Sequence, residues 1–423
     1  MSTHTPQTRA GKPAERFKAY RRIGVIGLGY VGLPTAMMFA RQGFSVHGVD
    51  ISPHALAVVN EGRVAEAYPE LTDWWQDIAQ PSEPDIVGGF TASSEPNACD
   101  VFLITVPTPV DETSKFCDLT AVRAAAESVA RVLKPGNLVI LESTVPPGTT
   151  RKVVKPILEG ATGLKAGADF HLCFSPERIL PGNTAYELVN NHRVLGSEHP
   201  DSAMLAHAIL QQVIAGDIYL TDDLTAEFCK LAENTYRDVN IALANELSIL
   251  ADDYGIEMNE AQRLINMHPR VNLLKPGIGV GGHCIAVDPW FFVEAHPEKT
   301  ALIGTSRRVN DKMPAYCAGK IQAEVADLEN PRICAVGLTY KPDVADMRES
   351  PAVRLVELLK EAGMNVVTYD PLLPEYANTS LTEAVSGADY LAVLVNHTTI
   401  NEQLLLNRET IKGLMRTPRI RVF

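Results

Sequence analysis

The 423-residue sequence lacks several features that mark specialised classes of protein. Its seven cysteines form no C-x-x-C pair, which argues against a disulfide framework or a zinc ribbon and favours a reducing compartment such as the cytoplasm. No cluster of His, Cys and Asp has metal-ligand spacing, so we expect no metal. The net charge of −13 disfavours nucleic acid as a partner, because an acidic surface repels phosphate backbones.

Targeting and membrane-spanning segments are also missing. The first twenty residues lack the apolar stretch that a signal peptide needs, so we expect residues 1–20 to form a flexible tail. The apolar run from Ile23 to Ala40 is barely long enough to cross a bilayer. Its glycines and Pro34 follow a nucleotide-binding pattern instead. We therefore expect no association with a membrane.

What the sequence does contain is an alternation of apolar runs with helical stretches. The runs IGVIGLG, FSVHGVD, DVFLITVPTP and NLVILEST are short, rich in β-branched residues and end in turn or polar residues. They predict strands of one parallel sheet, built from βαβ units. In such sheets ligands bind at the carboxyl ends of the strands. The residues that follow each run are therefore the first candidates for a site.

The sequence changes character near Thr221. More than thirty residues without glycine or proline run from there to Gly255 and predict one long helix, for which Asp222 or Asp223 suits the start and Gly255 the end. The following stretch HPRVNLLKPGIGVGGHCIAVDPW is too rich in glycine for a regular element. From Pro331 the alternation returns in RICAVGLTYK, NVVTYDP and DYLAVLVN.

These patterns predict the fold class and its divisions. A chain of this length is expected to form two or three domains. We predict an α/β protein with two Rossmann-like doubly wound domains, at residues 21–215 and 321–423. A central helical domain at residues 216–320, containing the long helix and the glycine-rich loop, joins them.

A dinucleotide-binding fingerprint follows the first predicted strand. Gly27, Gly29 and Gly32 form G-x-G-x-x-G at the mouth of a helix: they permit a tight turn, close approach of a pyrophosphate and close helix packing. The helix amino terminus offers N–H groups to the phosphates. Asp50 ends the next predicted strand, where its carboxylate can accept hydrogen bonds from both ribose hydroxyls. Because an acid there repels a ribose phosphate, we expect NAD, not NADP; the alternative is a purely structural turn.

Cys284 is the candidate nucleophile. Most cysteines are small buried hydrophobic residues, and that interpretation stays open here. However, Cys284 lies beside His283 and four residues before Asp288, in a glycine-rich loop that cannot be a packed strand. A thiolate can add to an aldehyde, and the resulting hemithioacetal can still lose hydride. Such a cysteine would allow two successive oxidations on one enzyme.

The long helix carries a second group of candidates. Lys230, Asn234 and Asp238 recur every four residues and share roughly one face. Such spacing also fits a solvated helix face. Asn234, Asn240 and Asn245 are poor helix formers in an otherwise apolar segment, so we expect their amides to bond to backbone or to a ligand. A partly buried lysine beside them could polarise an alkoxide or move protons.

Two further pairs have equally balanced interpretations. His268 and Arg270 in HPRVN suit a phosphate or sugar hydroxyls, or simply a surface loop. Glu177 and Arg178 in SPERILPG follow an apolar run, which suits a substrate contact or an ion pair at the end of a strand.

Seven motifs extend these observations along almost the whole chain. In order, GLGYVGLP, VPTP, EST, SPERILPG, KLAENTYRDVNIALANE, GVGGHC and KPDVADMRESP resemble the UDP-glucose/GDP-mannose dehydrogenase family. Within it, HPRVN followed by GVGGHCIAVDPWF resembles the UDP-N-acetyl-D-mannosamine 6-dehydrogenases. Relatives that act on UDP-GlcNAc or UDP-GalNAc tend to show HCIGVDPYY, so Ala286 and Trp290 decide this choice.

The resemblance implies a fold, a reaction and partners. It implies an NAD-binding domain, a central domain that forms a homodimer through the long helix, and a carboxyl-terminal domain that binds a UDP-sugar. The reaction would be four-electron oxidation of UDP-N-acetyl-D-mannosamine at C6 through a covalent intermediate on Cys284. Alternatives are the same chemistry on UDP-GlcNAc or UDP-GalNAc, a two-electron alcohol dehydrogenase with a structural Cys284, and a catalytically silent NAD-binding scaffold.

The resemblance also implies roles for individual residues. Lys230 and Asn234 would stabilise the substrate oxygen and oxyanion, and Asp288 with Thr144 would orient water and protons. Glu177 matches the family's acid for thioester hydrolysis. The NAD contacts would be Tyr30, Val31, Asp50, Thr108, Thr144 and Arg348. The sugar nucleotide contacts would be Arg178, Ile179, Lys230, Asn234, Arg237, His268, Arg270, Gly279, Tyr340 and Lys341.

One position departs from the family pattern. The UDP-glucose enzymes carry a second glutamate four residues after the match of Glu177, and this chain has Pro181 there. The sequence therefore leaves the identity of the hydrolytic base open.

Overall fold

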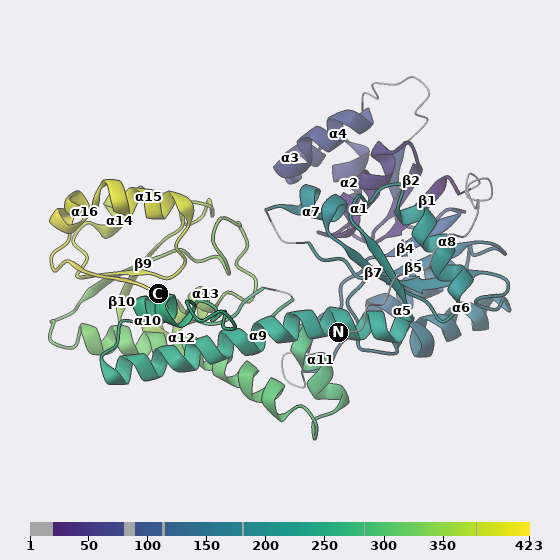
Figure 1. The fold of residues 1–423 in the computed structure, drawn as a ribbon. Helices are drawn as coiled ribbons and strands as arrows, with labels where there is room; N and C mark the ends of the chain where they lie inside the picture. Colours follow the sequence, from purple (N-terminus) through teal and green to yellow (C-terminus); the bar gives the residue numbers. More distant parts are fainter. Residues whose placement is uncertain (1–19, 80–88, 112–114, 180–181, 283, 378) are drawn as a thin grey trace. The chain divides into compact units, whose positions relative to one another are not determined.

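The computed structural model describes residues 20–79, 89–111, 115–179, 182–282, 284–377 and 379–423 (Figure 1). Apart from Tyr20, the predicted tail lies outside the described residues, as do His283 and Pro181. The chain forms two compact units, Met1–Thr108 with Asp118–Lys230 and Pro109–Cys117 with Leu231–Phe423.

The first unit contains an eight-stranded sheet in the order β3-β2-β1-β4-β5-β6-β7-β8, parallel except for the β6–β7 pair. The strands are β1 Arg22–Ile26, β2 Ser45–Val49, β3 Phe90–Ser93, β4 Val101–Ile104, β5 Leu138–Leu141, β6 His171–Phe174, β7 Arg193–Gly196 and β8 Ile218–Thr221. The four runs predicted as strands form β1, β2, β4 and β5, so that prediction is confirmed.

Helices cover both faces of this sheet. They are α1 Gly32–Arg41, α2 Pro53–Asn60, α3 Val64–Ala67, α4 Thr72–Ala79, α5 Thr120–Ala130, α6 Lys155–Thr162, α7 Thr184–Asn190 and α8 Pro200–Leu210, with a 3₁₀ turn at Pro69–Leu71 and a π turn at Thr150–Val154. Side chains alternate along β4, so Leu103 packs with α1, α2 and α8 while Phe102 and Ile104 pack with α5 and α6. Both faces are therefore buried, as in other parallel sheets.

The predicted long helix is confirmed as α9, Asp223–Tyr254, a single helix of 32 residues. Asp222 caps its start, because its Oδ1 accepts the Thr225 N–H at 3.1 Å. Gly255 follows its last residue with φ +68°, a left-handed conformation that stops the helix.

The second unit contains a four-stranded parallel sheet in the order β10-β9-β11-β12. The strands are β9 Arg332–Val336, β10 Asn365–Tyr369, β11 Tyr390–Val393 and β12 Arg419–Val422. Its helices after α9 are α10 Met258–Ile265, α11 Asp288–Ala295, α12 Ala301–Glu324, α13 Pro351–Glu361, α14 Leu381–Val385, α15 Thr398–Leu406 and α16 Arg408–Leu414. Helices α12 and α13 cover one face, and α14, α15 and α16 cover the other. The second α/β domain is thereby confirmed as doubly wound.

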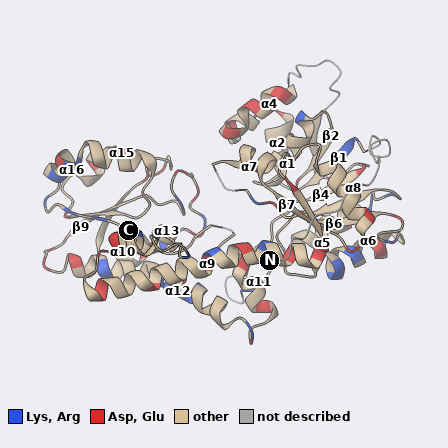
Figure 2. Ribbon diagram, in the orientation of Figure 1, with Lys and Arg blue, Asp and Glu red and all other residues tan. Residues whose placement is uncertain are grey.

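Between α10 and α11, the described residues 266–282 and 284–287 form no regular element. Helix α11 begins at Asp288, inside the stretch predicted as loop, because Pro289 suits the first turn of a helix. Basic and acidic residues are interspersed over the helices of both units (Figure 2). In the described parts of the chain, no helix is long and apolar enough to cross a membrane.

Candidate functional site

The turn after β1 has the geometry of a dinucleotide-binding loop. Gly27 has φ +96°, and its N–H donates to the Val49 carbonyl at 2.7 Å. A Cβ on Gly32 would lie 1.8 Å from the Gly27 carbonyl oxygen, so only glycine lets α1 start there. Gly29 differs, because a Cβ there would meet nothing within 4 Å. Neither packing nor a left-handed φ explains this glycine, whereas a pyrophosphate close to the backbone does.

Asp50 lies at the end of β2 with its carboxylate already oriented. Its Oδ2 accepts the Leu28 N–H at 2.7 Å and its Oδ1 accepts the Ser52 N–H at 2.8 Å. The side chain is half-buried. Each oxygen can still accept a second hydrogen bond, as pairing with the two hydroxyls of a ribose requires.

The other predicted cofactor residues of this unit surround the same strand ends. No side chain among the described residues caps α1 after Val31, which leaves its first N–H groups suited to an anion. The Tyr30 hydroxyl is hydrogen-bonded to the Thr184 hydroxyl. The Thr108 hydroxyl donates to the Thr144 carbonyl at 2.6 Å and joins the segments after β4 and β5. These residues fit an NAD molecule laid over the carboxyl ends of β1, β2, β4 and β5.

A buried cluster of charges lies after β5 and β6 of the same unit. Glu177 is 8% exposed, and its Oε1 lies 4.0 Å from the Lys230 Nζ, which is 5% exposed. Glu142 lies 3.9 Å from the Arg193 guanidinium, and both side chains are almost fully buried. Burial raises the pKa of Glu142 to about 7, although the charge of Arg193 opposes the shift.

The residues that follow Glu177 form hydrogen bonds within the protein. The Ile179 N–H donates to the Glu177 Oε2 at 2.6 Å, which fixes that carboxylate. The Arg178 guanidinium donates to the His192 carbonyl at 3.0 Å. The ion pair that the sequence suggested for Glu177 is thus formed with Lys230. The 4.0 Å between the Lys230 Nζ and the Glu177 Oε1 is longer than a hydrogen bond.

Cys284 lies just before helix α11 in the second unit. Its carbonyl accepts the N–H groups of Val287 and Asp288, at 3.1 and 2.8 Å, and its side chain is exposed. Asp288 is buried and accepts a hydrogen bond from the Asn234 amide at 2.6 Å. Lys230 precedes Asn234 by one turn of α9. The bond from Asn234 to Asp288 joins α9 to the start of α11.

The glycines before Cys284 are required by protein neighbours. Added Cβ atoms would lie 2.8 Å from the Tyr340 ring at Gly282 and 2.4 Å from the Glu349 carbonyl oxygen at Gly281. Gly279 has φ +129°, which strains any other residue, and an added Cβ would lie 3.0 Å from the Asn310 carbonyl oxygen. The interpretation that these glycines bring backbone close to a ligand is therefore incomplete, because the segment after β9 already fills that space.

The segment after β9 carries the residues that resemblance alone identified. Burial raises the pKa of Tyr340 to about 12, and the charges of Asp346 and Cys284 add to the shift, so the phenol stays protonated and can donate. Lys341 follows it and is half-buried. Arg348 is exposed and paired with Asp346 at 2.7 Å. The structure therefore brings Tyr340 to the Cys284 loop.

This segment begins with a second glycine turn that resembles the first. Gly337 has φ +82° and its N–H donates to the Tyr369 carbonyl, as Gly27 does to Val49. Asp370 accepts the Leu338 N–H at 2.6 Å, as Asp50 accepts that of Leu28. Here, however, His397 lies 3.1 Å from the Asp370 Oδ2 and both side chains are fully buried. The second turn therefore cannot offer its acid to a ribose.

His397 also holds the far end of that segment. Its Nδ1 accepts the Asp343 N–H at 2.8 Å, so its Nε2 carries the proton and donates to Asp370. Burial disfavours a charged Asp370, yet the bonds from His397 and two backbone N–H groups hold the pKa of Asp370 below its ordinary value. Asp343 and Glu349 have positive φ, which marks a strained segment that needs such support.

Other predicted positions on α9 have structural partners. Asp238 is fully buried and paired with Arg307 at 2.5 Å. The buried Asn245 amide donates to the Asn310 side chain, and its oxygen accepts the Gly277 N–H at 2.9 Å, which is the bond to backbone that was expected. The Asn240 amide donates to the Tyr236 carbonyl of its own helix at 2.7 Å. On the face of α9 that these residues share, Lys230 and Asn234 thus belong to the candidate site. Asp238 instead packs against α12 through Arg307.

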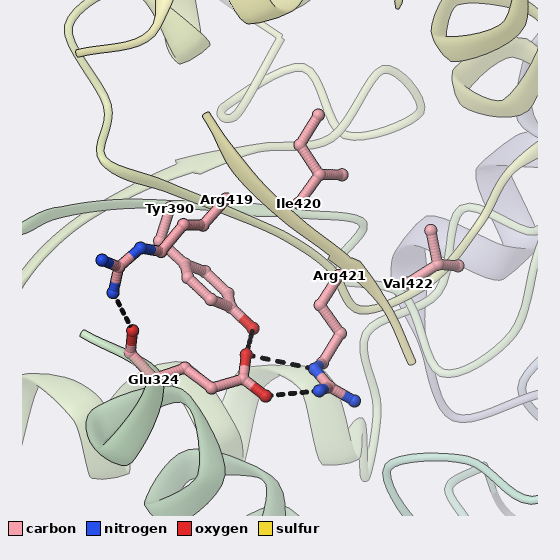
Figure 3. A pocket seen from close by; sticks show the side chains of 6 residues that line it. All are labelled: Glu324, Tyr390, Arg419, Ile420, Arg421 and Val422. Carbon is pink, nitrogen blue, oxygen red and sulfur yellow. Dashed lines mark hydrogen bonds and ion pairs between the residues drawn. The ribbon is translucent and has the colours of Figure 1, made fainter. Parts of the chain in front are cut away.

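Arg237, His268 and Arg270 are exposed. The Arg270 N–H approaches the His268 Nδ1 at 3.4 Å in the turn after α10. The second unit also has a pocket of about 580 Å³, lined by Glu324, Tyr390, Arg419, Ile420, Arg421 and Val422 (Figure 3). It contains none of the predicted site residues. Arg421 pairs there with Glu324 and Arg419 with Asp327, so we assign no ligand to it.

Sequence reasoning missed Glu142, Arg193 and His397. Glu142 was detectable, because it directly follows an apolar run at the edge of the sheet where ligands bind. Arg193 and His397 had no such signal, because only the fold brings them to their partners.

The first unit has a Rossmann turn shaped for a pyrophosphate and an acid placed for a ribose. The second unit has an exposed cysteine four residues before the acid of a hydrogen-bonded Asn–Asp pair. These are features of an NAD-dependent dehydrogenase. The chain belongs to the UDP-glucose/GDP-mannose dehydrogenase family. Its NAD binding domain model matches residues 21–214, its central domain model residues 224–312 and its UDP binding domain model residues 334–422.

Curated relatives and solved structures agree with this assignment. The chain is 44% identical over 407 residues to the UDP-N-acetyl-D-mannosamine dehydrogenase of Methanocaldococcus jannaschii, covering 93% of this chain and 89% of the relative. It is 42% identical over 403 residues to the enzyme of that name from Escherichia coli K12, covering 90% and 94%. The structure of UDP-D-ManNAc dehydrogenase from Pyrococcus horikoshii superposes with a TM-score of 0.87 at 39% identity, over 95% of this chain and 94% of that one.

Proposed function

We propose that this enzyme oxidises C6 of UDP-N-acetyl-D-mannosamine to the carboxylate, with two NAD per sugar. The main support is the exposed Cys284 side chain, together with the part-buried hydrogen bond that Asn234 donates to the buried Asp288. The identity of the sugar is supported by relatives that are 41–44% identical and are named UDP-N-acetyl-D-mannosamine dehydrogenase. Ala286 and Trp290 in the Cys284 motif support the same choice. NAD, when bound, supplies the hydride acceptor for both oxidations.

The first oxidation requires the alcohol to lose a proton as it loses hydride. Lys230 and Asn234 stabilise the developing oxyanion, because a buried ammonium and an amide donor act strongly where water is excluded. The Cys284 thiolate then adds to the aldehyde and forms a C–S bond. Asp288 accepts from Asn234 and orients its amide toward the substrate oxygen.

The second oxidation converts the hemithioacetal into a thioester on Cys284. Water then attacks the acyl carbon, the C–S bond breaks and the carboxylate product leaves. Glu177, buried and with one oxygen held by the Ile179 N–H, accepts the proton of the water. Thr144 and Asp288 help to orient that water.

The ligand contacts are part of the proposal. NAD contacts Gly27, Gly29, Tyr30, Val31, Gly32, Asp50, Thr108, Thr144 and Arg348. The UDP-sugar contacts Arg178, Ile179, Lys230, Asn234, Arg237, His268, Arg270, Gly279, Tyr340 and Lys341. The functional domains are residues 21–215 for NAD, 216–320 for the centre and 321–423 for the UDP-sugar, and the enzyme works in the cytoplasm.

We further propose a homodimer through α9. Tyr236, Leu243, Leu250 and Tyr254 are each about half or more exposed. At 3.6 residues per turn they lie within about 40° of one another on the helix. An exposed apolar stripe of this kind marks an interaction surface, and a second copy of α9 matches its length and chemistry.

The substrate is tested by counting NADH formed per mole of limiting sugar nucleotide. UDP-ManNAc, UDP-GlcNAc and UDP-GalNAc are compared side by side. We expect two NADH from UDP-ManNAc and little from the other two. Two NADH from another epimer alone would move the substrate and keep the chemistry, and one NADH would indicate a two-electron alcohol dehydrogenase.

A further inference from the structure

Glu142 is a buried acid that the proposed function does not use. It directly follows β5, and its backbone N–H donates to the Ile104 carbonyl at 2.9 Å. The side chain is 3% exposed. Its Oε2 has no hydrogen-bond partner among the described residues, and its Oε1 lies 3.9 Å from the Arg193 Nη1, beyond hydrogen-bond range. A buried carboxyl oxygen without a partner is costly, which favours a functional explanation.

The topology brings Glu142 to Glu177. Strands β5 and β6 pair with Leu141 opposite Phe174, and the Ser175 N–H continues the ladder to the Leu141 carbonyl at 3.0 Å. The chain segments that leave these two strands are therefore neighbours. The negative charge of Glu177 adds to the burial that raises the pKa of Glu142 to about 7. Glu142 therefore exchanges its proton near neutral pH, where a proton acceptor works best.

The charged groups that face the Glu142 carboxyl come from two elements, and a third element supplies the cation that faces Glu177. Arg193 faces it from the start of β7, and Glu177 faces it from the segment after β6. Lys230 on α9 faces Glu177 at 4.0 Å. One cation thus accompanies each carboxylate, and the pair can carry either one negative charge and a proton or two negative charges.

We propose that Glu142 and Glu177 together form the hydrolytic base, with Glu142 receiving the proton that Glu177 takes from water. This inference rests on the proposed function, because it concerns the thioester on Cys284. It gives the enzyme a second carboxyl although Pro181 stands where related enzymes have glutamate. Glu142 acts through Glu177 and is a positioning residue that does not touch the substrate.

Hydrolysis of the thioester needs only water and the two carboxylates. Water forms a C–O bond to the acyl carbon, the C–S bond breaks, and Cys284 leaves as thiolate. One proton of the water passes to Glu177 and then to Glu142, which must be ionised to accept it. Glu142 later returns this proton to solvent. Hydrolysis should therefore slow as the pH falls through about 7, because protonated Glu142 cannot accept a proton.

The test follows the acyl enzyme in the full-length protein with NAD and UDP-ManNAc. Glu142→Gln keeps the volume of the side chain and removes its ability to ionise. We expect its kcat to fall about 100-fold, the usual contribution of a general base. We also expect two NADH per active site in a burst, a thioester adduct on Cys284 in the intact mass spectrum, and loss of the acid limb near pH 7. Glu142→Asp should retain that limb.

Two comparison variants separate the possible failures. Glu227→Gln removes another buried acid of the first unit, which accepts the Thr150 N–H at 2.8 Å, and should accumulate no adduct. Glu177→Gln should accumulate it. If Glu177→Gln accumulates the adduct while Glu142→Gln turns over with the wild-type pH profile, the role of Glu142 is wrong and the proposed function stands. If the wild-type enzyme forms only one NADH and Glu177→Gln forms no adduct, the proposed function itself fails.

Discussion

Two glycines of the turn after β1 have different roles: the fold requires Gly32, and the bound cofactor requires Gly29. Gly32→Ala places a Cβ 1.8 Å from the Gly27 carbonyl oxygen, whereas Gly29→Ala meets nothing within 4 Å. We expect Gly32→Ala to lower the melting temperature strongly. Gly29→Ala should leave it nearly unchanged and weaken NAD binding about tenfold or more, because the methyl group occupies the place of the pyrophosphate. Thermal unfolding with and without NAD measures both effects. An unchanged affinity of Gly29→Ala for NAD would contradict the proposed role of this turn in cofactor binding.

Individual site residues differ in how far the sequence alone predicts them. Asp50 was predicted from spacing because its strand and turn are adjacent in the chain. Cys284 was predicted because its loop cannot be a packed strand. The pairing of Asn234 with Asp288 joins residues 54 positions apart and needed the fold. Glu142 had no assigned role, because the sequence does not reveal that Arg193 and Glu177 surround it.

At the scale of elements, the segment between β9 and α13 depends on α15 for its shape. His397, which directly precedes α15, accepts the Asp343 N–H at 2.8 Å, and Thr398 bonds to the Asp343 carboxylate. The alternation of strands and helices predicted β9, but no periodicity predicts a strained segment. Its shape is set by contacts between elements that lie far apart in the chain.

His397→Ala should therefore loosen Tyr340 and Lys341 without disturbing the NAD turn. The loss of two buried hydrogen bonds costs on the order of 1–3 kcal/mol, which we expect as an increase of about tenfold or more in KM for the UDP-sugar. The affinity for NAD should stay at its wild-type value. His296→Ala, an exposed histidine of the same unit, is the control. Equal KM values in the two variants would show that the segment needs no support from His397.

At the scale of the whole molecule, the exposed stripe on α9 is the feature that a single chain leaves unexplained. Leu243 lies in its middle, between Tyr236 and Leu250. We expect Leu243→Glu to convert the dimer into monomers, because it buries a charge at an apolar contact. Analytical sedimentation measures the oligomeric state. The control is Leu406→Glu, which changes an exposed leucine of α15. Monomeric wild-type enzyme, or a dimer that survives Leu243→Glu, would contradict the interface.

We propose that one chain carries out two oxidations through a covalent bond to Cys284. The most direct measurement is the number of NADH molecules formed per UDP-ManNAc by the wild-type enzyme and by Cys284→Ser. We predict two NADH for the wild-type enzyme. Cys284→Ser should retain NAD binding but turn over at least about 100-fold more slowly. One NADH per sugar from the wild-type enzyme, or two at an undiminished rate from Cys284→Ser, would contradict the account.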